Sequence, residues 1–124
     1  MPRRTWANKF RDAFRGLSLG MRGQSSFAVH AGVALVVVIL AGALRVGLVE
    51  WCLLLLCIAL VLAAELFNTA LECLAREVDR DYNPGIGAAL DIASAAVLAT
   101  SVGSAVVGGV IFIHRAGVLL FWWS

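Results

Sequence analysis

Three long stretches of this sequence carry almost no charge, and they constrain the fold more than any other feature. They lie near residues 26–45, 50–74 and 88–113, and each is predominantly apolar. A helix needs about 20 apolar residues to cross the hydrocarbon core of a bilayer. Backbone groups in lipid must hydrogen-bond within the protein, and three segments cannot close a β-barrel. Each stretch is therefore predicted to be a transmembrane helix.

Composition agrees with a protein whose main solvent is lipid. Hydrophobic residues make up 61% of the 124 residues and charged residues only 15%, whereas a soluble domain is about half apolar and about one quarter charged. A chain of this size has a large surface relative to its volume, and these polar residues are too few to cover it. A soluble monomer, a disordered chain and a disulfide miniprotein are thereby excluded. The net charge of +2 gives no indication of nucleic-acid binding.

The segment 1–22 differs in kind from the three apolar stretches. It contains six of the ten basic residues, and its apolar side chains recur at helical spacing: Trp6, Phe10, Ala13, Phe14 and Leu17. This pattern predicts an amphipathic surface helix that lies in the membrane interface, with its basic residues toward anionic headgroups. The alternative is a basic flank that only sets the topology.

The distribution of basic residues also predicts the orientation of the chain. A cytoplasmic N-terminus puts the 45–50 loop and the C-terminus outside, and the 76–86 loop inside. Eight of the ten basic residues then lie on the inner side, as the positive-inside rule requires. We therefore expect an all-α integral membrane protein, with a single membrane domain over residues 1–124.

Two carboxylates interrupt the second apolar stretch. Each costs about 3 kcal/mol at the bilayer centre, so a carboxylate in a membrane helix is a functional candidate. Glu65, Asn68 and Glu72 are spaced i, i+3 and i+7, which puts them within about 60° of one another on a helix. Arg76 and Asp79 continue this stripe into the charged loop.

The stripe permits more than one interpretation. In a polar seam between helices, Glu72 would pair with Arg76 and Asn68 would bond a neighbouring helix, but Glu65 then has no cationic partner nearby in the sequence. In the functional interpretation, the deeper carboxylate is a general base on a lipid hydroxyl. The shallower one binds a hard cation that carries nucleotide phosphates. A third interpretation, an ion or proton pathway, leaves Asn68, Thr69 and the charged loop unexplained.

The run Glu-Leu-Phe-Asn-Thr-Ala-Leu-Glu over residues 65–72 resembles the E-x-x-N-[ST]-A-[IL]-E signature of the prokaryotic diacylglycerol kinase and undecaprenol kinase family. Supporting similarities are Phe10-x-x-Ala13-Phe14-x-Gly16-Leu17, Phe27, Tyr82 and Asp91-x-x-Ser94-Ala95-Ala96-Val97-Leu98. The resemblance covers most of the chain. It implies a small homotrimeric kinase of the bacterial inner membrane, whose active sites lie between neighbouring subunits. Such enzymes transfer the γ-phosphate of ATP to a lipid alcohol, with Mg²⁺. Diacylglycerol and undecaprenol both remain open as acceptors.

The resemblance also implies a role for individual residues. Glu65 would be the catalytic base and Asn68 would position the reacting groups. Glu72 would bind Mg²⁺ together with the position occupied here by Gln24. Asp91 would belong to the nucleotide site, with Tyr82 in the neighbouring loop.

Three positions depart from the family pattern. Gln24 stands where the family has an acidic residue, and Leu90 where it has a lysine. Arg76 stands where the family has an aspartate, and Asp79 on the same face is expected to substitute for it. Arg76 or Arg80 is expected to supply the cation missing at Leu90. These departures motivate an alternative function, a catalytically impaired family member that acts as a lipid-binding or scaffolding membrane protein.

Three smaller predictions concern structure. Asn83 is expected to cap a helix whose first residue is Pro84. His30, inside the first apolar stretch, is expected to be a satisfied interhelical histidine. The three cysteines, all in the second stretch, are expected to be reduced and to act as small, buried hydrophobic residues. They are Cys52, Cys57 and Cys73.

Overall fold

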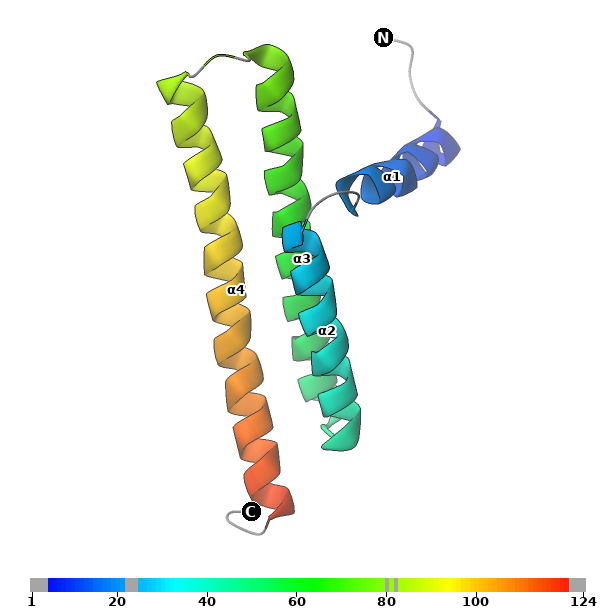
Figure 1. The fold of residues 1–124 in the computed structure, drawn as a ribbon. Helices are drawn as coiled ribbons and strands as arrows, with labels where there is room; N and C mark the ends of the chain where they lie inside the picture. The colour runs from blue at the N-terminus through cyan, green and yellow to red at the C-terminus, as the bar shows by residue number, and fades with distance from the viewer. Residues whose placement is uncertain (1–4, 22–24, 80, 82, 121–124) are drawn as a thin grey trace.

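The computed structural model describes residues 5–21, 25–79, 81 and 83–120. Its elements are four helices: α1 (Trp6–Met21), α2 (Ser25–Ala43), α3 (Leu48–Val78) and α4 (Pro84–Leu119). The last three lie side by side, and α1 projects to one side of them (Figure 1). These three are long enough and apolar enough to cross a membrane. The prediction of an all-helical chain with three long apolar helices is thus confirmed.

The helices α3 and α4 are longer than the apolar stretches from which they were predicted. Their 31 and 36 residues correspond to about 46 and 54 Å at 1.5 Å per residue, well beyond a hydrocarbon core of about 30 Å. The apolar residues identify only the part of each helix that is suited to lipid. Arginine and glutamate have about the same helix propensity as leucine, so a helix can extend into charged sequence. The two helices therefore continue past the start of α2, and a short loop joins their ends (Figure 1).

The predicted cap at the start of α4 is confirmed. The side-chain oxygen of Asn83 accepts hydrogen bonds from the backbone N–H groups of Gly85 and Ile86, at 2.9 and 3.3 Å. Pro84 follows in the first turn of the helix, where its missing N–H costs nothing. This cap fixes the residue at which the α3–α4 loop ends and α4 begins.

The opposite end of the bundle contains the buried apolar cluster. Ala41, Val46, Leu54 and Ile111 meet there, where α2 turns into α3. The turn closes with the N–H of Val46 on the carbonyl of Ala41, and Arg45 adopts a φ of 55°, the left-handed conformation common just past a helix end. Arg115 of α4 donates from Nε to the Leu44 carbonyl at 2.8 Å. The apolar core thus lies far along α3 from the polar stripe.

Most apolar side chains of the three long helices face outward. At most 17% of the residues in each span's apolar window are buried, so lipid or other protein must cover the remainder. The described cysteines form no disulfide, and only Cys57 is half-buried within the chain, whereas Cys52 and Cys73 are exposed on the helix surface. Along α1, Trp6, Phe10 and Phe14 are more than 60% exposed, while Gly20 is buried against α3.

Candidate active site on helix α3

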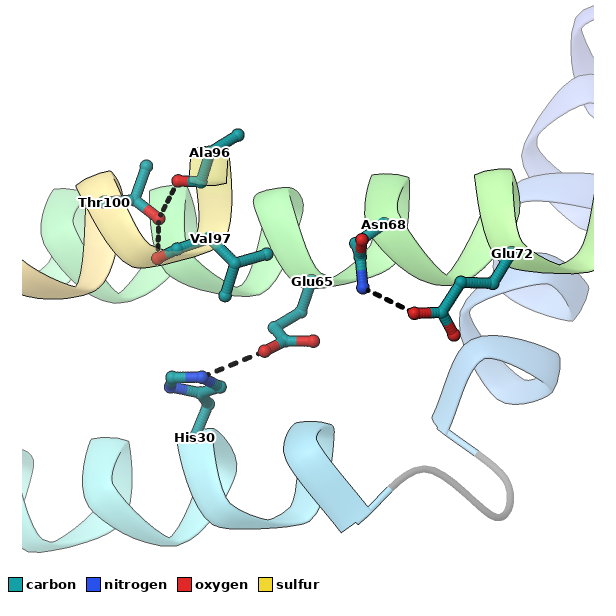
Figure 2. Close-up of polar contacts among 7 residues, drawn as sticks. All are labelled: His30, Glu65, Asn68, Glu72, Ala96, Val97 and Thr100. Atoms are coloured by element: carbon teal, nitrogen blue, oxygen red, sulfur yellow. Dashed lines mark hydrogen bonds and ion pairs between the residues drawn. The ribbon is translucent and has the colours of Figure 1, made fainter. Parts of the chain in front are cut away.

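The polar stripe lies on one face of α3, as the helical spacing predicts. Glu65 and Thr69 are buried, with 4% and 6% of their surface exposed. Asn68 and Glu72 are half-buried. The helix that carries them is continuous from Leu48 to Val78, so it sets the spacing of the two carboxylates rigidly. Glu72 lies two helical turns beyond Glu65, nearer the end of α3 at Val78, and Figure 2 shows Asn68 between them.

Glu65 has a partner on another helix. Nε2 of His30, on α2, lies 2.9 Å from Oε1 of Glu65 (Figure 2). No cationic residue lies close to Glu65 along the chain, whereas this contact joins residues of two helices. The available signal was a histidine in an otherwise uncharged stretch, and the expectation that it lies between helices agrees with this contact.

Asn68 and Glu72 form the second polar pair. The Nδ2 amide of Asn68 donates to Oε1 of Glu72 at 3.0 Å (Figure 2). The Glu72–Arg76 pair required by the polar-seam alternative is not formed, because the Arg76 guanidinium turns toward the Sγ atom of Cys73, at 3.3 Å. The other amide atom, Oδ1 of Asn68, is buried and accepts no hydrogen bond. The site therefore contains an oxygen donor whose bonding capacity is unused.

A polar cleft of about 650 Å³ opens at the end of α3 and the start of α4. Its walls bring together Glu72, Arg76 and Asp79 from the α3 side, with Leu90 on the α4 side. The cleft thus gathers three of the predicted site residues. It combines one cationic and several acidic side chains around open space.

Asp79 lines the cleft, but from a position outside the helix and not from the predicted helical face. It does not continue the helical stripe, because α3 ends at Val78 and Asp79 caps it in an extended conformation with φ −151°. The carboxylate oxygens accept from the N–H of Asp81 at 3.0 Å and from Nδ2 of Asn83 at 3.3 Å. Asp79 thus orders the α3–α4 loop as well as lining the cleft.

The remaining predicted site residues are less closely gathered. Asp91 is exposed on α4 and does not line the cleft, although its neighbour Leu90 does. Gln24 and Tyr82 lie outside the described residues.

The donor set at Glu72 suits a hard cation. The described residues contain no group of three or more His, Cys, Asp or Glu side chains close enough to hold a metal ion. Mg²⁺, however, is commonly held by one or two carboxylates, with substrate phosphates and water filling the other positions. The Glu72 carboxylate and the unpaired Oδ1 of Asn68 are oxygen donors of this kind.

Together, the fold and the site define a class: a small integral membrane protein with three long apolar helices and a polar cleft between the end of α3 and the start of α4. Comparison with known proteins makes the class specific. Residues 11–112 match the family model for prokaryotic diacylglycerol kinase, so the chain belongs to that family, as residues 65–72 predict.

One curated relative is a protein named diacylglycerol kinase from Synechocystis sp., which is 33% identical over 101 residues. The match covers 81% of this chain and 58% of the relative, so it spans little more than half of that protein. No solved structure matches the chain.

Proposed function

We propose that this protein is a lipid kinase that transfers the γ-phosphate of ATP to a membrane lipid alcohol at the cytoplasmic face of the bacterial inner membrane. The observation that carries the proposal is the pair of carboxylates on one face of α3. Glu65 is buried where α1 and α2 approach α3, and Glu72 lines the open polar cleft. A lipid hydroxyl and a water-soluble nucleotide would approach such a pair from opposite directions.

Glu65 is the proposed general base. Gly20, at the end of α1, packs against Leu66, the residue after Glu65. If α1 lies in the membrane interface, Glu65 is at the depth of the lipid headgroups, where an acceptor hydroxyl would be. A buried carboxylate within hydrogen-bond reach of that hydroxyl can take its proton during transfer.

Glu72 is the proposed Mg²⁺ ligand, with Asn68 Oδ1 and the side chain at Gln24 as further oxygen donors. The bound ion would neutralise charge on the transferring phosphates. Asn68 would also hold the Glu72 carboxylate in place through their 3.0 Å hydrogen bond. A partner of this kind commonly affects metal affinity by about 10- to 100-fold.

The nucleotide is proposed to occupy the cleft between the ends of α3 and α4. Arg76 is the cation there, with Asp79 on the same wall. Tyr82 and Asp91 are carried over from the family resemblance. Because Leu90 contributes no charge, Arg76 is the proposed counter-charge for the phosphates, with Arg80 as the other candidate.

The membrane orientation and the assembly are also proposals. A cytoplasmic N-terminus puts the cleft on the same side as the basic segment 1–22, as the positive-inside rule favours. A homotrimer with shared sites is the state that the family resemblance implies. The large exposed apolar faces of the three long helices are compatible with contacts to other subunits as well as to lipid.

The test is phosphate transfer from γ-labelled ATP in detergent micelles, with diacylglycerol and undecaprenol supplied separately, with and without Mg²⁺. The name of the Synechocystis relative favours diacylglycerol. Labelled lipid that requires Mg²⁺ would support the proposal and identify the acceptor. The absence of product from a folded, correctly assembled protein, with either lipid, would contradict it.

The alternative of an impaired, lipid-binding family member is favoured by one observation. Leu90 puts an apolar side chain in the cleft wall, next to the acidic side chains that would face a nucleotide. This alternative predicts no Mg²⁺-dependent binding of ATP. Saturable binding with a dissociation constant between about 1 μM and 1 mM, the ordinary range for enzyme substrates, would count against it.

A further inference from the structure

We propose that His30 is a positioning residue for the base: it holds Oε1 of Glu65, so that Oε2 is directed to the acceptor hydroxyl. This inference rests on the proposed kinase function. It assigns a task to a residue of α2 that the sequence indicated only as a structural contact between helices.

The geometry supports a specific contact. The two atoms, His30 Nε2 and Glu65 Oε1, are 2.9 Å apart (Figure 2). The side chains are 24% and 5% exposed, respectively. Bulk water therefore competes little for the carboxylate, and a hydrogen bond to an ionised group is stronger than one between neutral groups.

The other polar groups drawn around Glu65 are engaged elsewhere. Asn68 donates to Glu72, two turns along α3 from Glu65. On α4, the Thr100 hydroxyl lies 3.0 Å from the carbonyl oxygens of Ala96 and Val97, within its own helix (Figure 2). His30 is thus the described group in contact with the Glu65 carboxylate that can fix its orientation.

The apolar surroundings of the His30 imidazole favour one fixed orientation of the His30–Glu65 pair. His30 lines a mainly apolar groove of about 400 Å³ between α2, α3 and α4, with Val33 and Val61 among its walls. An imidazole N–H without a partner in such surroundings is costly. Because an ionised carboxylate only accepts hydrogen bonds, the hydrogen of the contact belongs to Nε2. One carboxylate oxygen is then held and the other can accept a proton.

The proposed step balances without the histidine changing its protonation. The acceptor hydroxyl oxygen forms a bond to the γ-phosphorus, and the bond from that phosphorus to the β,γ-bridging oxygen breaks. ADP leaves with the bridging oxygen and its electron pair. The hydroxyl proton passes to Oε2 of Glu65, while His30 keeps its hydrogen on Nε2. His30 therefore acts on the base and not on the substrate.

The test compares His30→Leu, which removes the donor, with His30→Gln, which keeps an N–H donor on a side chain of similar reach. Losing a hydrogen bond to a charged group should lower kcat by about 10- to 100-fold, with the KM for ATP unchanged because the nucleotide binds at the other end of the stripe. His30→Gln should recover most of that loss. His114→Leu, the same change near the end of α4, should leave kcat unchanged.

Other patterns of results would overturn the inference. If His30→Leu keeps the wild-type kcat, or if His30→Gln is as slow as His30→Leu, the donor is not what matters. A rise in KM for ATP, equal to the loss in kcat, would indicate a general structural defect. Wild-type protein that phosphorylates no lipid would contradict the proposed function itself, which distinguishes the two failures.

A spectroscopic readout covers the case in which His30→Leu fails to assemble. In protein with ¹⁵N-labelled histidine, the Nε2 signal of His30 should carry a hydrogen and should shift when Glu65→Gln is introduced. The His114 signal should stay in place. An Nε2 signal without a hydrogen, or one indifferent to Glu65→Gln, would overturn the inference independently of activity.

Discussion

Gly20 packs so closely against Leu66 that a Cβ atom on residue 20 would lie 2.6 Å from the Cδ2 atom of Leu66. This contact joins the end of α1 to α3, one residue beyond Glu65. The position of α1 and the surroundings of the proposed base are therefore linked.

The contact predicts different results for small and large side chains at position 20. Gly20→Ala should be tolerated, because the end of the Leu66 side chain can move aside. Gly20→Phe should displace α1 and lower kcat/KM for the lipid by about 10- to 100-fold, as small misplacements at active sites do. The control is Gly16→Phe on the same helix, since nothing lies within 4 Å of a Cβ at Gly16. Equal losses in both phenylalanine variants would contradict the explanation.

Removing the Asn68 side chain should weaken the metal site without destroying the base. Asn68→Ala takes away both the hydrogen bond to Glu72 and the unpaired Oδ1. The Mg²⁺ concentration that gives half-maximal activity should rise about 10- to 100-fold. A Mg²⁺ titration of phosphate transfer measures this directly. Leu71→Ala, at an exposed position of the same helix, should leave the titration unchanged; an Asn68→Ala titration that matches wild type would remove Asn68 from the metal site.

The positive charge of Arg76 is expected to contribute to ATP binding. Arg76→Gln removes the cation from the cleft wall, so the KM for ATP should rise about tenfold, a modest effect because the side chain is exposed. Arg76→Lys should retain most of the affinity, and the KM of the wild type should rise with ionic strength. If Arg76→Gln and wild type have the same KM, another residue pairs with the phosphates.

Spin labels can determine whether α1 lies on the membrane surface. In a background with Cys52, Cys57 and Cys73 replaced by alanine, single cysteines at Phe14 and Arg15 would carry nitroxides. The label at Phe14 should be more accessible to oxygen, which dissolves in lipid, and the label at Arg15 to a water-soluble nickel chelate. Equal access of both reagents to both labels would indicate that the segment is only a basic flank.

Much of the fold was predictable because lipid imposes simple rules. Charge-free stretches predicted the long helices, and Asn83 with Pro84 predicted the start of α4. The spacing of Glu65, Asn68 and Glu72 correctly predicted one shared face, because helical geometry alone determines it.

Sequence spacing did not predict the contacts that depend on where a helix ends or on which helix lies opposite. Asp79 was predicted to continue the stripe, but the helix stops one residue before it. The i+4 spacing allowed a Glu72–Arg76 pair in the polar-seam alternative, yet the Arg76 side chain contacts Cys73. The partner of Glu65 could not be predicted from spacing, because the packing of α2 on α3 brings His30 to it.

The most direct measurement compares two glutamates of α3 in the same phosphate-transfer assay. Glu65→Gln keeps the size of the side chain but cannot take a proton, so labelled lipid should no longer form while folding and assembly persist. Glu50→Gln makes the same change in the first turn of the helix, at the other end of the bundle, and should leave transfer intact. Wild-type rates of lipid phosphorylation in the Glu65→Gln variant would show that Glu65 is not the general base.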